Sequence, residues 1–198
     1  RTEPRSADCG LTQSDLRSRR RHGGTERPRG KGSYHSSDGL DRLDPKTDTF
    51  VHYKHDPKNS ASISDNWVWP ILEDRNGVLW VGTFQGGLNK LDRASGKFSR
   101  YRHDDANPRG LAGDRLYALY QDRSGMIWIG LGDLGVDRFH PEMTAFRHYR
   151  KDPASPSSLS EDNITALFVD RSGIAWIGTR AGLNRWDRSS GNFSQYPQ

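Results

Sequence analysis

Most of the chain alternates between short apolar runs and polar turn residues, as in a series of β-hairpins. The run NITALFVD (163–170) alternates with a period of two, which predicts a strand. The expected faces of this strand are Ile164, Ala166 and Phe168 on one side and Leu167 and Val169 on the other. DRSG then supplies a turn, with Gly173 where a positive φ is needed, and IAWIGT returns as a second strand. GLNRWD and FSQY, separated by RSSG, predict a third and a fourth strand.

This four-strand pattern recurs with a fixed period. DRNGVLWVGT (74–83) and DRSGMIWIGL (122–131) match DRSGIAWIGT (170–179), and the tryptophans of the three copies are 48 residues apart. The last copy lacks one residue between its second and third strands, which marks that segment as a loop. A fixed period of this length is typical of a repeat architecture, so we interpret the recurring residues as scaffold. They are the tryptophans Trp80, Trp128 and Trp176, the turn glycines Gly77, Gly125 and Gly173, and the turn aspartates Asp74, Asp122 and Asp170.

Four antiparallel strands in 48 residues, without the periodicity of a helix, are typical of a β-propeller blade. We therefore predict an all-β fold, a partial β-propeller of about three and a half four-stranded antiparallel blades with a 48-residue repeat, over residues 38–198. The predicted parts are a blade remnant at 39–53 and blades at about 66–101, 114–149 and 162–196. Propellers usually close with roughly four to eight blades, so this arc is expected to leave two sheet faces uncovered.

Charge is unevenly distributed along the 198 residues. Residues 1–33 hold nine Lys/Arg against four Asp/Glu, whereas the remainder holds 21 of each. Residues 1–37 are also poor in apolar side chains, which predicts a disordered basic tail; the alternative is an upstream blade read in a non-native frame. A basic arm for nucleic acid or membrane is the competing interpretation, but aromatic residues do not interleave with the arginines, and we expect no nucleic-acid partner. We also expect no signal peptide or transmembrane segment in this chain, because no apolar run approaches the ~20 residues of a membrane span.

Motifs that suggest catalysis or a cofactor fail on their context. GLGDLG (130–135) satisfies G-x-G-x-x-G, but VDRFHP follows it as strand and turn rather than as a helix that could hold a pyrophosphate. His55 and His103 share one repeat position with Lys151, which favours a solvated cation over a metal ligand. The spacing assembles no nucleophile, base and orienting group. We therefore predict no enzymatic activity, no cofactor and no metal site.

Functional residues are expected where the repeats differ in their loops, because positions on which the repeats agree are explained by the fold. If the first strand of each repeat is innermost, the loops between second and third strands share one face with the entrance of the inner strand. An aromatic ring, an amide, a carboxylate and a guanidinium around one opening could hold a small polar ligand such as an oligosaccharide. The alternative is that these exposed loops have drifted freely. The candidate ligand-binding residues are Phe84, Gln85, Asp133 and Arg180 in the loops, and Trp67, Arg115 and Asn163 at the strand entrances.

The repeated string D-x-x-G-x-(I/L)-W-(I/V)-G-(T/L), a short loop and then G-(L/V)-(N/D)-(R/K) resembles the two-component regulator propeller repeat, over residues 39–198. Members of that family are typically large bacterial sensors with two seven-bladed propellers outside the inner membrane. A membrane span and an output domain, such as a histidine kinase or a diguanylate cyclase, follow the propellers. The resemblance implies a periplasmic segment of such a receptor, whose partners are the remainder of the propeller and the output domain.

The pattern and the resemblance together favour a ligand-sensing propeller segment of a bacterial signal-transduction receptor, non-catalytic by itself. The alternative is a propeller scaffold for protein–protein interaction or receptor dimerisation. A mixed polar and aromatic face would favour the first function, whereas a broad exposed apolar edge would favour the second. A propeller lyase or glycosidase would need convergent carboxylates or a metal cluster, which the sequence does not provide.

Overall fold

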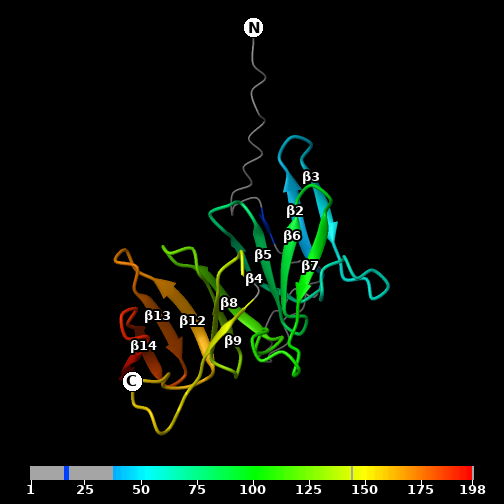
Figure 1. The fold of residues 1–198 in the computed structure, drawn as a ribbon. Coiled ribbons are helices and arrows are strands. Elements are labelled where there is room, and N and C mark those ends of the chain that lie inside the picture. Colours follow the sequence, from blue (N-terminus) through cyan, green and yellow to red (C-terminus); the bar gives the residue numbers. More distant parts are fainter. Residues whose placement is uncertain (1–15, 18–37, 144, 198) are drawn as a thin grey trace, which may run out of the picture.

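The computed structural model describes residues 16–17, 38–143 and 145–197, and these fold into β-strands joined by turns and connectors (Figure 1). Three sheets have four antiparallel strands each, and one sheet has three. Sheet 1 contains β1 (Leu16–Arg17), β2 (Leu40–Asp44) and β3 (Thr49–Tyr53). Sheet 2 contains β4 (Val68–Glu73), β5 (Leu79–Thr83), β6 (Leu88–Asp92) and β7 (Lys97–Tyr101). Sheet 3 contains β8 (Leu116–Gln121), β9 (Ile127–Leu131), β10 (Val136–Phe139) and β11 (Arg147–Tyr149). Sheet 4 contains β12 (Ile164–Val169), β13 (Ala175–Thr179), β14 (Gly182–Trp186) and β15 (Phe193–Pro197).

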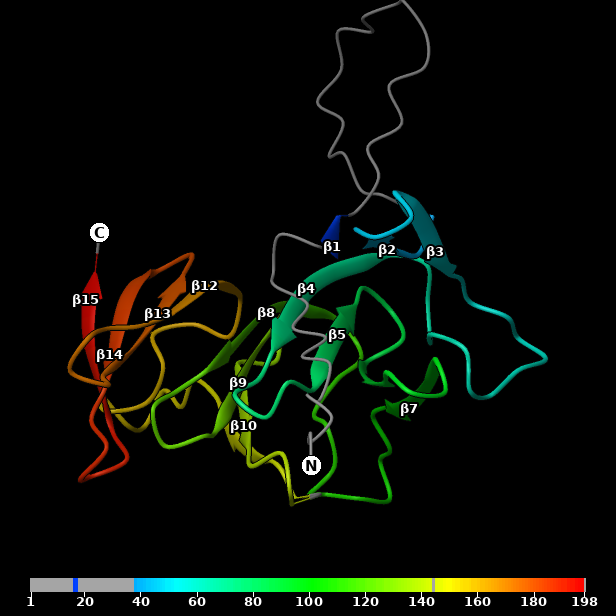
Figure 2. The same ribbon diagram turned by 90° about the horizontal axis from the view of Figure 1, so that it is seen from above.

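The sheets follow one another in chain order and lie side by side (Figure 2). Within each four-stranded sheet the strands are neighbours in sequence order, as in an antiparallel meander. The first strands form the inner side of the array, because β8 contacts both β4 and β12. The predicted all-β fold, a partial β-propeller of four-stranded blades, is therefore confirmed.

The turn between the first and second strands of each full sheet is closed by one aspartate and one glycine. In sheet 3, Asp122 Oδ1 accepts the backbone N–H of Ser124 (2.8 Å) and of Met126 (3.1 Å). Gly125 has a φ of 84°, a backbone angle that residues other than glycine rarely adopt. The second carboxylate oxygen, Oδ2, accepts the indole N–H of Trp128 at 2.8 Å. Sheets 2 and 4 repeat this contact at 2.9 Å, in the pairs Asp74 with Trp80 and Asp170 with Trp176.

The tryptophans fill the spaces between sheets. Trp80 of sheet 2 is fully buried in a cluster with Leu116, Ile127 and Phe139 of sheet 3. Trp128 of sheet 3 is buried in the same way against sheet 4. Each inter-sheet connector adds one fully buried apolar anchor, in the order Ile63, Leu111 and Leu159. Burial of these side chains between neighbouring sheets is the main source of the cohesion of the fold.

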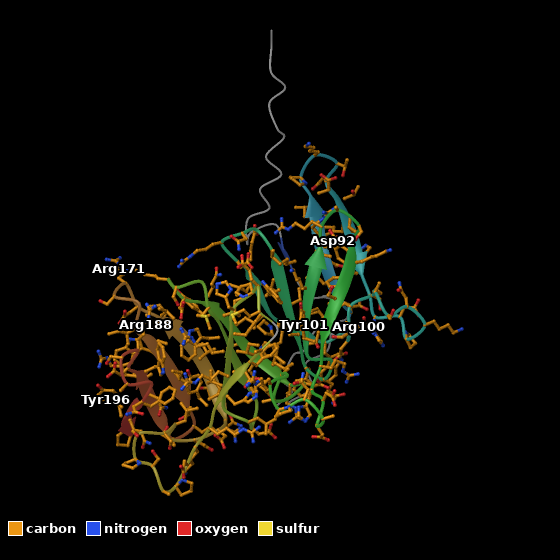
Figure 3. The ribbon with its side chains drawn as sticks, viewed as in Figure 1. Asp92, Arg100, Tyr101, Arg171, Arg188 and Tyr196 are labelled. Carbon is orange, nitrogen blue, oxygen red and sulfur yellow. The ribbon has the colours of Figure 1, made fainter. Side chains whose placement is uncertain are left out.

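Sheet 4 exposes the face that sheets 2 and 3 turn toward the following sheet. Leu183 and Tyr196 are 41% and 49% exposed, whereas their counterparts in sheet 3, Val136 and Tyr149, are 0% and 8% exposed. Trp176 is half-buried, although its hydrogen bond to Asp170 is intact. Figure 3 shows Tyr196 on this outermost sheet, far from Arg100 and Tyr101. An apolar sheet face is therefore open to solvent.

The first strand of each full sheet contains a β-bulge. β12 shifts register against β13 between Ile164 and Ala166, and Ile164 and Val169 are both buried while Phe168 is exposed. The expected grouping of Ile164 with Ala166 and Phe168 on one face is therefore wrong, because one extra residue moves every later side chain to the opposite face. β4 and β8 shift register at the corresponding place.

The predicted tail lies mostly outside the described residues. At Leu16–Arg17 the structure places a short strand, β1, which pairs antiparallel with β2. These two residues of the predicted tail thus pair with the strand remnant at 39–53. For the remainder of the tail, both the predicted disorder and the alternative of a non-native reading frame stay predictions.

Candidate functional site

Four aromatic side chains and one arginine gather at one end of the inner strands of sheets 2 and 3. We call Trp67, Trp69, Phe84, Tyr117 and Arg115 the aromatic cluster. The Phe84 ring lies 5.3 Å from that of Trp67 and 6.0 Å from that of Trp69, with the Trp69 ring stacked on it. The Tyr117 ring lies 4.8 Å from Trp69 and 6.2 Å from Phe84. The Arg115 guanidinium carbon lies 5.1 Å from the centre of the Phe84 ring, within the range of a cation–π contact.

Inner-strand bulges place two of these rings. Trp69 lies in the register shift of β4 between Val68 and Ile71, and Tyr117 is the extra residue of β8 between Leu116 and Ala118. Bulges re-aim side chains and are over-represented beside active sites. Here the bulge of β4 directs Trp69 away from the core, and its side chain is 42% exposed.

The loops hold the other members of the aromatic cluster. The Trp67 carbonyl accepts the backbone N–H of Phe84 at 2.9 Å, which ties the strand entrance to the loop after β5. A Cβ at Gly132 would lie 2.7 Å from Tyr117 Cε2 and 3.0 Å from Arg115 Cδ. The absence of a side chain at Gly132 therefore makes room for the tyrosine and the arginine.

The structure brings together three of the seven candidate ligand-binding residues, namely Trp67, Phe84 and Arg115. Gln85 follows Phe84, and its loop is fixed by hydrogen bonds from the Gln85 N–H to Asp65 and from Arg102 to the Gln85 carbonyl. Asp133 and Arg180 lie exposed on the equivalent loops of sheets 3 and 4, and Asn163 is half-buried at the entrance of β12. Across the part of the chain that the structure describes, the ring contacts that define the aromatic cluster include none of these last three residues.

Sequence reasoning missed Trp69 and Tyr117, because both stand within predicted strands rather than in loops. The signal that could have found them is their place two residues after the predicted entrance residues Trp67 and Arg115. Side chains two apart on a strand share a face, so an exposed residue at the entrance points to an exposed one at the next position but one.

The aromatic cluster can stack on a flat apolar surface and donate hydrogen bonds from one guanidinium. It contains no carboxylate, thiol or imidazole, and the phenol of Tyr117 is its one group that could act as a general acid, base or nucleophile. Among the residues described here, no three His, Cys, Asp or Glu side chains gather to hold a metal ion. Aromatic stacking and hydrogen bonding are thus what this arrangement can supply to a ligand.

A cavity of about 340 Å³ lies at the other end of the strands, between sheets 3 and 4. It is lined by the turns at 122–124 and 172–174 and by residues 185–189. Its carboxylates are engaged within the fold, since Asp122 accepts hydrogen bonds from Ser124 and Trp128. The cavity shares no residue with the aromatic cluster, and we do not assign it to the same site.

Comparison with solved structures places the chain among propeller domains. At 27% identity and a TM-score of 0.61, it is similar to the extracellular domain of a putative hybrid two component system of B. thetaiotaomicron; the match covers 66% of this chain and 18% of that one. The extracellular domain of a putative one component system of the same organism is 22% identical, with a TM-score of 0.65, 83% of this chain covered and 22% of that one. Virginiamycin B lyase of Staphylococcus aureus shares the fold at 14% identity and a TM-score of 0.59, over 82% of this chain and 50% of that one.

The chain therefore spans about a fifth of the length of the two extracellular domains. No curated protein matches it in sequence. No helix among the described residues is long and apolar enough to cross a membrane.

The family model of the two component regulator propeller matches residues 62–85, 110–133 and 158–181. Each match runs from the apolar anchor of a connector, through the bulged first strand and the Asp–Trp contact, to the loop after the second strand. Each of the three full sheets therefore contains one segment that matches the repeat of the two component regulator propeller, at the places where the sequence pattern predicts it.

Proposed function

We propose that the chain is a ligand-sensing segment of a signal-transduction receptor, and that the aromatic cluster is part of its ligand site. The observation that carries this proposal is the exposure of two tryptophans, Trp67 and Trp69, beside Phe84 on the inner strands. Burying large aromatic rings is strongly favourable, so a group of exposed rings is typical of a binding surface. The similarity to extracellular domains of two component systems supports the same function.

A small polar ligand with a flat apolar face, such as an oligosaccharide, suits the aromatic cluster. The aliphatic face of a sugar ring stacks on aromatic rings, and the Arg115 guanidinium can donate paired hydrogen bonds to hydroxyl or carboxylate oxygens. The cluster pairs no nucleophile with a carboxylate or imidazole base, which supports a role that is non-catalytic by itself. Asp133, Arg180, Asn163 and Gln85 remain candidate contacts for a longer ligand that extends toward sheet 4.

Signal output would come from elsewhere in the receptor. Ligand binding would bias two states of the assembled propeller and so reach an output domain, such as a histidine kinase or a diguanylate cyclase. The extracellular placement of the similar domains supports a periplasmic location for this segment. In the isolated chain only part of the pocket is present, so we expect a weaker affinity than in the assembled receptor.

The open face of sheet 4 favours a second candidate function, a scaffold for protein interaction or receptor dimerisation. Its exposed apolar residues are Phe168, Leu183 and Tyr196, together with the half-buried Trp176. Light scattering of the chain over a range of concentrations tests this function. A dimer that the substitution Leu183→Asp dissociates would support it, and a monomer at all concentrations would exclude self-association through this face.

Calorimetric titration of the complete sensory region with a panel of oligosaccharides tests ligand sensing. Trp69→Ala and Phe84→Ala should each weaken binding by about fivefold or more, because stacked aromatic contacts contribute roughly 1–3 kcal/mol. Phe168→Ala is the control, because Phe168 is an exposed aromatic residue of sheet 4 that lies outside the aromatic cluster. Unchanged binding in both aromatic variants, with the proteins folded, would remove the aromatic cluster from the site.

A further inference from the structure

Each connector between successive sheets is held by a side chain at one equivalent position in the last strand of the following sheet. These residues are Arg100 of β7, His148 of β11 and Gln195 of β15. Arg100 donates to the Ser62 carbonyl at 2.9 Å, and Gln195 donates to the Ser158 carbonyl at 3.0 Å. His148 Nε2 lies 3.1 Å from the Pro108 carbonyl oxygen. Arginine and glutamine keep their donors at every physiological pH, whereas histidine does not.

Both ring nitrogens of His148 face hydrogen-bond acceptors. Nδ1 lies 2.6 Å from Oδ1 of Asp137, and Nε2 faces the Pro108 carbonyl. An ionised carboxylate and a carbonyl can only accept, and a neutral imidazole has one N–H. Both contacts are therefore hydrogen bonds only when His148 is an imidazolium.

His103 repeats this arrangement at the start of the same connector. Its Nδ1 lies 2.9 Å from the Leu111 carbonyl oxygen, and its Nε2 lies 2.9 Å from Oδ1 of Asp105. At the equivalent positions, His55 makes only the carbonyl contact, to Ile63 at 2.9 Å, and Lys151 replaces the histidine. Of the three connectors that the structure describes, the one at residues 102–115 is thus contacted by two histidines whose ring nitrogens both face acceptors.

Among the three four-stranded sheets, the residue at the position of Asp137 is charged only in sheet 3; in sheet 1, Asp41 and His52 repeat the aspartate–histidine contact at 2.6 Å. Asp137 is fully buried, and its Oδ2 accepts the backbone N–H of Ala112 at 2.8 Å. Sheets 2 and 4 have an asparagine at this position, whose amide donates to a connector serine at 2.8–2.9 Å. We call the hydrogen-bonded pairs Asn89–Ser64 and Asn184–Ser160 neutral circuits, because neither member carries a charge. Their counterpart in sheet 3 is the group of Asp137, Ala112 and His148.

The charges around the two histidines favour their protonated forms. The hydrogen bond with Asp137 raises the pKa of His148, against burial and the nearby Arg150, which lower it. The bond to the Leu111 carbonyl and then Asp105 raise the pKa of His103, with a further contribution from Asp114, against a lowering by burial.

We propose that residues 102–115 form a proton-dependent latch between sheets 2 and 3, which is closed while His103 and His148 are imidazolium ions. When His148 loses a proton, its remaining N–H stays on Nδ1, because the buried Asp137 carboxylate has the greater need of a donor. The bond to the Pro108 carbonyl is then lost, and the middle of the connector is released. Arg115 of the aromatic cluster stands at the end of this connector, so the latch also controls how firmly that guanidinium is held over Phe84.

The direction of the pH dependence follows from the raised pKa values. A group whose pKa is higher in the folded state stabilises the fold fully below its unfolded value, which is 6.5 for histidine. This contribution disappears as the pH rises through the folded-state pKa. The latch is therefore closed in mildly acidic solution and loosens in alkaline solution.

The test compares the full chain with two variants patterned on its own repeats. In the first, Ala112→Ser, Asp137→Asn and His148→Gln copy the neutral circuit of sheet 4. In the second, His148→Arg copies Arg100. Histidine ring ¹⁵N shifts give the protonation of His103 and His148, and hydrogen exchange gives the protection of residues 104–112, corrected for intrinsic rates, from pH 5.5 to 9.

In the parent, protection of residues 104–112 should fall across the His148 midpoint, by up to tenfold for each unit by which folding raises its pKa. Both variants retain His103, so they should show only the part of this fall that follows the His103 titration, and the part that follows His148 should be absent. Parent protection that is independent of pH across the His148 titration would overturn the proposal. An equal fall in the parent and in His148→Arg would overturn it as well, and neither readout depends on whether the aromatic cluster binds a ligand.

Discussion

Replacing Trp128 with alanine should destabilise the chain strongly, because this residue joins sheet 3 to sheet 4. The side chain is 1% exposed, and its indole N–H donates to Asp122 at 2.8 Å. Its ring lies 4.8 Å from that of Trp186 and 5.8 Å from that of Tyr149. The Arg138 guanidinium carbon lies 5.0 Å from the ring centre.

The expected magnitude follows from these contacts. Truncating a buried aromatic side chain to alanine costs about 3–5 kcal/mol, and the lost hydrogen bond to Asp122 adds about 1 kcal/mol. Trp176→Ala is the matched control, because Trp176 makes the same bond to Asp170 at 2.9 Å but packs beneath no further sheet. We expect this control to cost about 1–2 kcal/mol, mainly the hydrogen bond and part of the burial.

Urea unfolding, followed by circular dichroism and by the fluorescence of the remaining tryptophans, measures the free energy of unfolding of both variants. The account predicts that Trp128→Ala loses at least about 2 kcal/mol more than Trp176→Ala. Equal losses would show that the tryptophan acts only through the turn aspartate. The assignment of the inter-sheet tryptophan as core would then be wrong.

Other substitutions test the turns and the acid response. Gly135→Ala should cost more than about 2 kcal/mol in the same urea assay, because a Cβ there would lie 2.1 Å from the Tyr149 carbonyl oxygen at a φ of 78°. Gly125→Ala, at a φ of 84° but with no contact closer than 3.6 Å, should cost only about 1–2 kcal/mol. Burial raises the pKa of Asp122, but the hydrogen bonds from Ser124 and Trp128 and the Arg138 charge outweigh it, so this pKa is lowered from 3.8. The stability that Asp122 contributes is therefore present above pH 3.8 and lost as the pH falls through the lowered pKa, and Asp122→Asn should flatten that part of the unfolding profile.

Much of the fold could be predicted from the sequence because its information is repeated. The 48-residue period of Trp80, Trp128 and Trp176 indicates equivalent strands, and the turn motif fixes where each hairpin reverses. The bulges could not be predicted, since simple alternation does not reveal an extra residue such as Thr165 in β12. That single residue reverses which side of the strand faces the core.

The candidate site was predicted in part for a related reason. Connectivity returns equivalent loops to one face, which places Phe84 with Trp67 and Arg115. Whether Asp133 or Arg180 also reaches the cluster depends on how far each loop leans toward the inner strands. The sequence pattern does not determine that backbone geometry. The bulged Trp69 and Tyr117 were missed because strand residues of this kind are usually core.

The histidine contacts of the connector were also beyond the reach of the sequence alone. His148 and Asp137 are 11 residues apart and become neighbours only through the register of β10 with β11. Once the register is known, the sequence shows this pairing as well. Sheets 2 and 4 combine an asparagine with a connector serine, whereas sheet 3 combines Asp137 with Ala112 and His148. A cross-strand pair of this kind is recognised once the register is known.

The central claim, a ligand site at the aromatic cluster, is tested most directly by the indole N–H signals of the six tryptophans during titration with oligosaccharides. The account predicts that a bound oligosaccharide shifts the signals of Trp67 and Trp69, which are 38% and 42% exposed. The signals of the buried Trp80 and Trp128, whose indole N–H groups are held by Asp74 and Asp122, should stay in place as internal references. A ligand that binds in calorimetry but leaves Trp67 and Trp69 unmoved would contradict the claim.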